Sequence, residues 1–438
     1  MRCIPQVSDP SIARANLGYA VYRGTLVGSV AQYLGIQYAK APVDDLRFRR
    51  PVDPDAKRKG PYLSLDLRLK RRCLGPVCLG ISEPYPNAEK DEDCLYANVW
   101  APANTTVESK LPVWLFIQGG GYTLNSNANW NGTEVVQRSG HEIVFVNLNY
   151  RVGLWGFLAS ERVRADGDLN AGLLHQRFML RWLRRHIAQF GGNPDHIAIH
   201  GASAGAGPVA LHLVAHGGDA TDPESGEKLF VGAFNLTLQR TGCDNNGDGN
   251  DEAMACLRSK STEALQAANI PTPFPGRLAS TVIFYEICRI FFSRKTTDGE
   301  LLPNGSVRLE GTVFAANASR PGDMTAFLQS NYPLLSQSNA SAIVKDYSLL
   351  DNLPNHNVWF PSTARAHGET TFICPAADIL NSYVHHLNSS RAWGYRYDVH
   401  DENEIAAGLG VPHLVSSWAI FGPDSQPGGH GPESYYTI

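Results

Sequence analysis

The chain has 438 residues, of which 43% are hydrophobic and 18% are charged, and its formal net charge is −4. This length fits one large α/β domain or two medium ones, and it allows a hydrophobic core that is stable without disulfides or metal ions. The near-balanced charge excludes a general nucleic-acid footprint, and no apolar run reaches the roughly 18–20 residues of a membrane span. The first 21 residues lack the apolar segment of a signal peptide.

Short apolar runs alternate with helical patterns in the first half of the chain. Strands are predicted at 113–118, 141–150 and 194–201, and helices at 173–192 and 204–218. The strands lack period-two alternation, which is typical of a sheet covered on both faces. The pattern therefore predicts an α/β fold with a mostly parallel central sheet covered by helices.

The pattern weakens further along. Residues 219–310 are rich in loops, with a helical stretch at 251–269; a turn and helix follow at 367–387, and a late strand is predicted at 391–399. The stretch 244–255 imitates half of a calcium-binding loop but has Ala255 where the last acidic ligand belongs, so we interpret it as a solvated loop. No linker separates independent parts, so we expect a single domain over residues 1–438.

One serine stands between two glycines at a strand-to-helix junction. The segment reads IAIHGASAGAGPVALHL, with Gly201, Ser203 and Gly205 forming Gly-x-Ser-x-Gly. By itself this short motif arises by chance in many proteins. With a strand before it and a helix after it, the motif predicts a nucleophile elbow, which holds the serine hydroxyl at a helix N-terminus.

A serine nucleophile needs donors for the negative charge that develops on its substrate. Three glycines, 119–121 in FIQGGGY, directly follow a predicted buried strand. They are either an ordinary glycine turn or the source of unobstructed backbone N–H groups for an oxyanion hole, and their place upstream of the elbow favours the second interpretation.

These motifs are part of a longer likeness. The chain resembles the type-B carboxylesterase/lipase family, the cholinesterase-like α/β-hydrolases, and among them the fungal members most. The likeness extends from about residue 18 to the C-terminus, through YLGIQYAKAPVDDLRFRRP, EDCLYANVWAP, FIQGGGY, NYRVGLWGFL, the run from Gly172 to Gly205, EGTVFAANAS and AAGLGVPHLVSSWAIFGP. It implies an α/β-hydrolase fold.

The resemblance implies a catalytic triad of Ser203, Glu310 and His413. His413 would take the serine proton and return it to the leaving alcohol, and Glu310 would orient and stabilise the imidazolium. Their own surroundings do not single these two out: Asp298 rivals Glu310, and the chain has fourteen histidines. The oxyanion hole would consist of the N–H groups of three residues, Gly120, Gly121 and Ala204.

The implied activity is a carboxylic-ester hydrolase that forms an acyl-enzyme on a small-molecule or lipid ester. It needs no metal or cofactor, and no nucleic acid, membrane span or protein partner is implied. Tyr122, Leu124, Trp130, Trp155 and Phe157 are candidates for an acyl pocket, although each fits a core position equally well.

Cysteines and sequons point to a secreted glycoprotein. The resemblance implies two disulfides, one between Cys78 and Cys94 and one between Cys243 and Cys256. Cys73 is a rival for the place of Cys78. The remaining cysteines, Cys3, Cys288 and Cys374, have no evident partner. Seven Asn-x-Ser/Thr sequons favour an oxidising secretory history; they lie at Asn104, Asn131, Asn235, Asn304, Asn317, Asn339 and Asn388.

The chain also departs from the family. His175 stands where the family has an aspartate that would pair with an arginine such as Arg151, so we expect an uncompensated buried cation. Segments around residues 234, 303 and after His413 are short, which predicts a shortened chain with an incomplete C-terminal part. The alternatives to an active hydrolase are therefore a catalytically impaired, truncated or mis-spliced homologue and a non-catalytic cholinesterase-like binding module.

Overall fold

A computed structural model describes residues 14–55, 74–125, 129–214, 227–244, 250–270, 311–332, 335–386 and 397–422. The chain divides into two compact units. Unit 1 comprises Met1–Pro271 and Phe421–His430, and unit 2 comprises Thr272–Ile420 and Gly431–Ile438.

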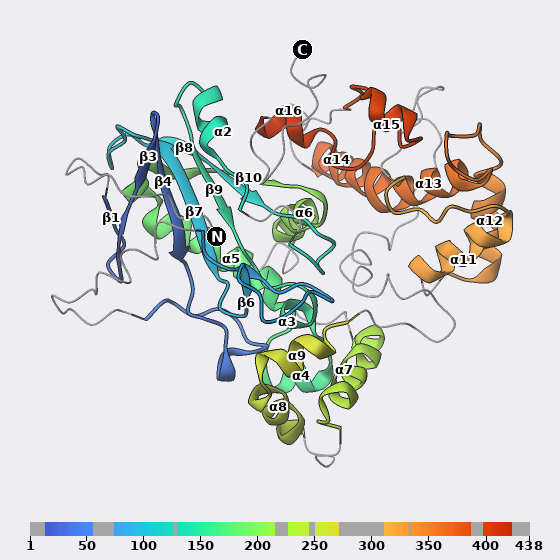
Figure 1. Cartoon of the computed structure of the whole chain (residues 1–438), viewed down its shortest axis with the longest axis horizontal. Coiled ribbons are helices and arrows are strands. Elements are labelled where there is room, and N and C mark those ends of the chain that lie inside the picture. Colours follow the sequence, from blue (N-terminus) through green and yellow to red (C-terminus); the bar gives the residue numbers. More distant parts are fainter. Residues whose placement is uncertain are drawn as a thin grey trace. The chain divides into compact units, whose positions relative to one another are not determined.

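Unit 1 is built on a six-stranded sheet with the strand order β10-β8-β9-β7-β4-β3 (Figure 1). Its strands are β3 (Thr25–Val27), β4 (Val30–Gln37), β7 (Tyr96–Pro102), β8 (Leu111–Ile117), β9 (Val144–Leu148) and β10 (Gly192–Gly201). The pairs β10–β8 and β8–β9 are parallel, whereas β9–β7, β7–β4 and β4–β3 are antiparallel. The described sheet is thus mixed, and it is parallel at the end that carries Ser203.

The middle of the sheet is buried on both faces, as its continuous apolar sequence predicts. Every residue of β9 is buried, and β8 becomes fully buried toward its C-terminal end. Helix α2 (Thr133–Arg138) packs on β4, β7 and β9, and helices α5 (Ala171–His186) and α6 (Ala206–Val214) pack on β10. Phe116 stacks on Trp130 at 5.2 Å and meets Phe421 edge-on at 4.8 Å.

Small elements complete the frame of unit 1. The strands β1 (Arg14–Asn16) and β2 (Val21–Arg23) form one two-stranded sheet, and β5 (Val77–Cys78) and β6 (Lys90–Asp91) form another. Short 3-10 turns are η1 (Asp44–Leu46), η2 (Ile187–Phe190), which continues α5, and η3 (Ser203–Gly205), which precedes α6.

A helical layer forms a second core in unit 1. Its helices are α3 (Gly153–Phe157), α4 (Glu161–Asp166), α7 (Glu227–Thr241), α8 (Asn250–Ser259) and α9 (Thr262–Ala268). Trp155, Phe234, Met254 and Leu257 are buried together there. Serines cap the N-termini of two of these helices: Ser160 accepts from the N–H of Val163 at 3.1 Å, and Ser261 from that of Ala264 at 3.2 Å.

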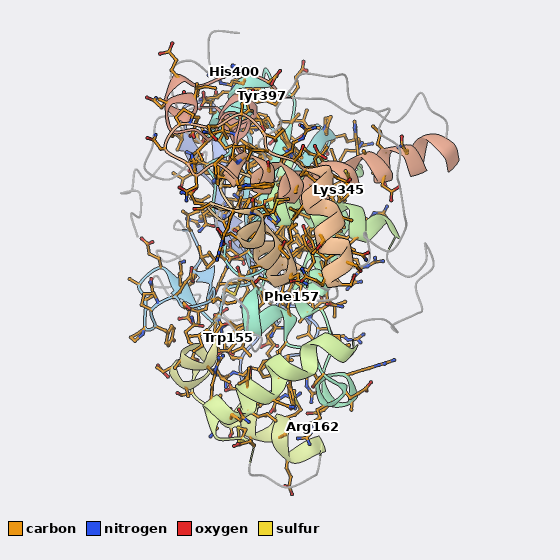
Figure 2. The ribbon with its side chains drawn as sticks, turned by 90° about the vertical axis from the view of Figure 1, so that its right-hand side faces the viewer. Trp155, Phe157, Arg162, Lys345, Tyr397 and His400 are labelled. Atoms are coloured by element: carbon orange, nitrogen blue, oxygen red, sulfur yellow. A yellow bond between two sulfur atoms is a disulfide. The ribbon has the colours of Figure 1, made fainter. Side chains whose placement is uncertain are left out.

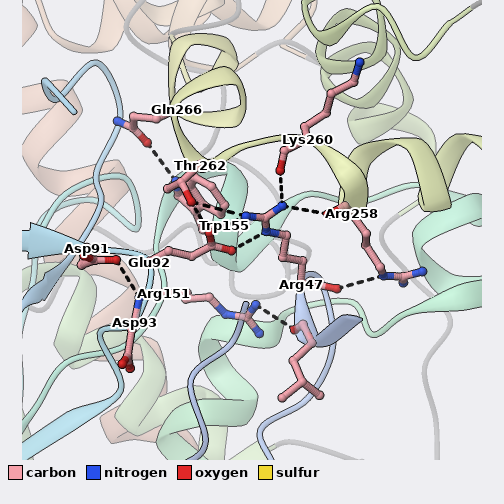
Figure 3. A network of polar contacts seen from close by, with 11 residues as sticks. Arg47, Asp91, Glu92, Asp93, Arg151, Trp155, Arg258, Lys260, Thr262 and Gln266 are labelled. Atoms are coloured by element: carbon pink, nitrogen blue, oxygen red, sulfur yellow. Dashed lines mark hydrogen bonds and ion pairs between the residues drawn. The ribbon is translucent and has the colours of Figure 1, made fainter. Parts of the chain in front are cut away.

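A buried ion pair joins this helical layer to the N-terminal segment (Figure 3). Arg47 and Glu92 are 4% and 3% exposed, and two hydrogen bonds of 2.5 and 2.7 Å connect them. Arg47 also donates to the carbonyls of Arg258 and Lys260, and Thr262 donates to Glu92 at 2.8 Å. Both charges are therefore satisfied on every side, which a buried pair requires in order to be tolerated.

Unit 2 is helical where it is described. Its helices are α11 (Pro321–Asn331), α12 (Gln337–Asp346), α13 (Phe360–Gly368), α14 (Cys374–His386), α15 (Glu402–Ala406) and α16 (Ser417–Phe421), the last of which ends in unit 1. A π-helical turn, η5 (Glu369–Ile373), joins α13 to α14. Met324, Phe327, Leu328 and Ala366 form its core. The strand predicted at 391–399 is wrong for residues 397–399, which have no regular structure; the remainder lies outside the described residues.

Two features are absent from the residues that the structure describes. No described helix is both long and apolar enough to cross a membrane. The same part of the chain holds no cluster of three or more His, Cys, Asp or Glu side chains arranged to hold a metal ion.

Candidate active site

Ser203 lies at a sharp turn between β10 and α6 and has a left-handed backbone, with φ of 55°. Such a conformation is strained for a residue with a side chain and persists only where the surroundings enforce it. A Cβ atom at Gly201 would lie 2.1 Å from the carbonyl oxygen of Gly205, and one at Gly205 would lie 2.0 Å from that of Ile117. The turn therefore excludes side chains at both flanking positions, as the elbow motif predicts.

The three-glycine segment lies directly against this turn. A Cβ atom at Gly119 would be 2.5 Å from the carbonyl oxygen of Ala202 and 2.9 Å from Cβ of Ser203. Gly120 and Gly121 have positive φ angles of 112° and 62°. The carbonyl of Gly120 accepts from the N–H groups of Thr123 and Leu124 at 3.0 and 2.8 Å, which fixes the turn. The backbone of this segment therefore lies in close contact with the candidate nucleophile, and its role as an oxyanion hole stays a prediction.

Hydrogen bonds connect the glycine segment to the first disulfide. Gln118 Nε2 donates to Asn125 Oδ1, and Asn125 Nδ2 donates to the carbonyl of Cys78 at 2.9 Å. Cys78 is bonded to Cys94, and a second disulfide joins Cys243 to Cys256. These are the two pairs that the family resemblance implies.

The aromatic candidates for an acyl pocket separate into different environments. Trp130 is 2% exposed against Phe116, and Trp155 is 3% exposed in the helical layer, where it donates to Gln266 Oε1 at 2.9 Å. Both are core residues. The rings of Tyr122 and Phe157 meet edge-on, with their centroids 5.4 Å apart. Figure 2 labels Phe157 and Trp155. Leu124, in contrast, is 40% exposed.

His413 belongs to unit 2 and lies on the loop between α15 and α16. Its ring is 4.6 Å from that of Phe372 in the π-helical turn and 5.2 Å from that of Phe314. The next residue, Leu414, has φ of 69°, and its carbonyl accepts from Ser417 N–H at 2.9 Å. Two aromatic rings and a tight turn thus orient the imidazole.

Glu310 lies outside the described residues, but the residues that follow it are described in unit 2. A Cβ atom at Gly311 would lie 2.1 Å from the carbonyl oxygen of Ala364 in α13, so this segment packs closely on that helix. The hydroxyl of Thr312 donates to the carbonyl of Leu409 at 3.1 Å. Leu409 lies four residues before His413 in the chain. Ser203 belongs to unit 1, so the assembly of the three residues into a triad stays a prediction.

Sequence reasoning did not single out His367, which is buried beside this loop in unit 2. Its Nδ1 atom is 3.3 Å from the hydroxyl of Thr371 and 3.5 Å from that of Tyr332, and its ring packs on Phe327 at 5.2 Å. Burial, with a smaller contribution from the charge of His413, lowers the pKa of His367 to about 4. It is therefore neutral at physiological pH. Its residue type gave no signal among fourteen histidines; only the fold places it here.

The mixed sheet, the strained serine between glycines and the glycine segment at the end of β8 define an α/β-hydrolase. The chain belongs to the Carboxylesterase family, whose model matches residues 17–433.

Known proteins resemble the chain at both the sequence and the structural level. It is 30% identical to the secreted lipase ARB07186/07185 of Arthroderma benhamiae, over 93% of this chain and 77% of that protein. Lipase 2 of Geotrichum candidum is 35% identical over 57% of this chain, and the match covers 52% of that lipase, about half its length. The crystal structure of Aspergillus niger EstA superposes with a TM-score of 0.83 at 39% identity, over 97% of this chain and 85% of that one.

Proposed function

We propose that the chain is a serine carboxylic-ester hydrolase in which Ser203, Glu310 and His413 form the triad. The observation that carries the proposal is the strained backbone of Ser203 with the glycine segment against it. A backbone held out of its preferred region is a feature of functional sites, and this one lies where a tetrahedral intermediate would need donors.

In the proposed reaction, His413 removes the proton of the Ser203 hydroxyl as its oxygen attacks the ester carbonyl. The tetrahedral intermediate collapses to an acyl-enzyme when His413 returns the proton to the leaving alcohol. Water, deprotonated by the same histidine, then releases the carboxylic acid. Glu310 keeps the imidazole in the required tautomer and stabilises its charged form.

The N–H groups of Gly120, Gly121 and Ala204 form the proposed oxyanion hole. Among the described residues, the N–H groups of Gly120 and Gly121 donate to no backbone carbonyl, while the Gly120 carbonyl is occupied on the other side of the turn. Ala204 N–H lies at the start of the helical segment that continues as α6, where the helix dipole favours negative charge.

Two contacts in unit 2 support the pairing of Glu310 with His413. The hydrogen bond between Thr312 and Leu409 and the ring contact between Phe314 and His413 hold the residues just after Glu310 against the histidine loop. Asp298, the rival acid, lies outside the described residues.

The substrate class proposed is a small-molecule or lipid ester, since the chain belongs to the Carboxylesterase family and relatives are named lipases. We also propose a secreted glycoprotein. Relatives carry the name secreted lipase, and the chain has two disulfides. All sequon asparagines that the structure describes are exposed, namely Asn104, Asn131, Asn235, Asn317 and Asn339.

A fluorophosphonate probe and a short-chain chromogenic ester test the proposed function. We expect stoichiometric labelling and turnover, both abolished in Ser203→Ala. Glu310→Gln is expected to lose most of the turnover, and the matched variant Asp298→Asn to keep it; the reverse result would reassign the acid. A cooperatively melting protein with neither labelling nor turnover would instead be a binding module, and a protein without a melting transition an impaired product.

A further inference from the structure

A groove of about 340 Å³ opens on unit 1 beside β10, and its described lining includes none of the residues assigned to the ester chemistry. This volume falls at the lower end of the range of small-molecule sites. Helix α5, strand β10 and helix α6 form the groove, and its lining residues are Arg177, Leu180, Arg181, Arg184, Ile197, Ile199 and His212.

Three arginines line one side of the groove from α5. Arg177, Arg181 and Arg184 follow one another at intervals of four and three residues, so they share one helix face. Arg181 and Arg184 are exposed and Arg177 is partly buried. Within the described part of the chain none of the three has an acidic partner within 4 Å, whereas their neighbour Arg185 pairs with Asp53 at 3.0 Å.

The floor of the groove is apolar. Ile197 and Ile199 are two residues apart on β10 and therefore face the same side of the sheet, and Leu180 extends from α5 toward the same space. Both isoleucines are only partly buried, and β10 is the end strand of the described sheet. The dipole of α5 explains cations in its last turn, but it does not explain why an apolar strip lies beside them.

His212 closes the groove as a neutral ring. Its Nε2 atom lies 3.0 Å from Gln176 Oε1, and burial together with the charge of Arg177 lowers its pKa to about 4. It adds apolar surface and no charge at neutral pH, so the charge of the groove is that of the guanidinium groups.

We propose that this groove binds a single-chain amphiphile with an anionic carboxylate head, the fatty acid anion being the class that fits. Guanidinium groups bind carboxylates through paired hydrogen bonds, and the adjoining isoleucines and leucine cover an alkyl chain. Because the groove is concave, it can enclose a single amphiphile, whereas a flat bilayer surface would not enter it. The site does not depend on the proposed hydrolase activity, because no triad residue lines it.

Titration calorimetry of the full chain with laurate tests this proposal. The proposed acyl pocket is first blocked by reaction with an alkyl fluorophosphonate, and mass spectrometry measures the extent of labelling. If the proposed function fails and no label is bound, the untreated protein is titrated instead. We expect binding of one laurate, weakened at least tenfold in Arg181→Gln/Arg184→Gln. The matched control Arg185→Gln removes a charge from the same helix outside the groove and is expected to change the affinity less than twofold.

Two further ligands test whether the alkyl chain contributes to binding and whether the groove binds a single molecule rather than a membrane surface. Butyrate, which has the head without the long chain, is expected to bind at least tenfold more weakly than laurate. Equal laurate affinity in the double variant and the wild type, or no laurate binding at all, overturns the proposal. So does arginine-dependent binding of phosphatidylglycerol vesicles without binding of laurate, which would make the arginines a lipid-surface patch.

Discussion

The guanidinium of Arg151 lies against the imidazole of His175, with Nη2 of the arginine 3.2 Å from Nε2 of the histidine, and both side chains are buried. Backbone carbonyls of Leu46 and Arg49 accept the other hydrogen bonds of the arginine. Arg151 presents a donor to each ring nitrogen, Nη2 to Nε2 and its backbone N–H to Nδ1 at 3.5 Å. A neutral imidazole has one acceptor nitrogen, and the shorter contact assigns that role to Nε2. Burial and the Arg151 charge hold the pKa of His175 well below its usual value. The expected uncompensated cation is thus solvated by carbonyls and a neutral ring.

Replacing His175 with aspartate supplies the counter-charge that Arg151 lacks at this position. Burial lowers the pKa of Arg151 to about 10, although the more distant charges of Glu92 and Asp168 favour its protonated form. We expect His175→Asp to raise the free energy of unfolding by about 1–3 kcal/mol relative to His175→Asn, which has the same shape without the charge. Urea denaturation of the two variants measures the difference; equal stabilities would show that the carbonyls already satisfy the arginine.

Acid stability reports on the buried histidine of unit 2. His367 has a folded pKa of about 4, below the value of about 6.5 in an unfolded chain. Between pH 6.5 and 4 the unfolded chain binds a proton that the folded chain does not, so stability falls as the pH falls, by roughly 1.4 kcal/mol per unit for this group. We expect His367→Asn to reduce the slope of unfolding free energy against pH by that amount in this window. An unchanged slope would mean that His367 is protonated in the folded chain.

Glycine substitutions separate the strained elbow from ordinary helix positions. Gly205→Ala would place a methyl group 2.0 Å from the carbonyl of Ile117, so the turn must shift, and we expect loss of fluorophosphonate labelling. Gly322→Ala is the matched control. A Cβ atom there meets nothing within 4 Å, and its position in α11 predicts a gain of about 0.5–1 kcal/mol in stability. Unimpaired labelling of Gly205→Ala would contradict the tight turn.

The Arg47–Glu92 pair should be far more sensitive to substitution than a surface pair. Glu92→Gln leaves the buried guanidinium of Arg47 without its counter-charge, and we expect a loss of about 3–5 kcal/mol. The comparison is Asp323→Asn, which removes the charge of an exposed partner 3.0 Å from Arg320 and is expected to change stability far less. Chemical denaturation measures both. Similar effects of the two substitutions would show that solvent reaches Glu92.

The sequence predicts the part of the fold in which local pattern and burial agree. Strands at 113–118, 141–150 and 194–201 and the helix beginning near residue 173 are found as β8, β9, β10 and α5 with shifts at their ends. The antiparallel half of the sheet was missed, because a strand buried on both faces carries no sign of its partner's direction. The segment predicted as a strand at 391–399 is rich in aromatic residues, and tertiary context overrides their β preference at residues 397–399.

Only part of the candidate site can be predicted from local sequence motifs. Ser203 and glycines 119–121 are predicted from short contiguous motifs, since a strained turn needs particular small residues next to one another. His413 and Glu310 have no local signature, and only the family resemblance selects them. His367 and the arginine groove depend on contacts between distant segments, so no sequence window contains them.

The hydrogen bonds from Gln118 through Asn125 to Cys78 connect the redox state of the chain to its glycine segment. Reducing agents such as dithiothreitol would open the Cys78–Cys94 bridge and loosen the carbonyl on which Asn125 is anchored. Under the proposed function, preparations from a reducing cytosol would then keep the proposed nucleophile but lose the position of the proposed oxyanion donors. Assays of the proposed activity should therefore use protein expressed under oxidising conditions.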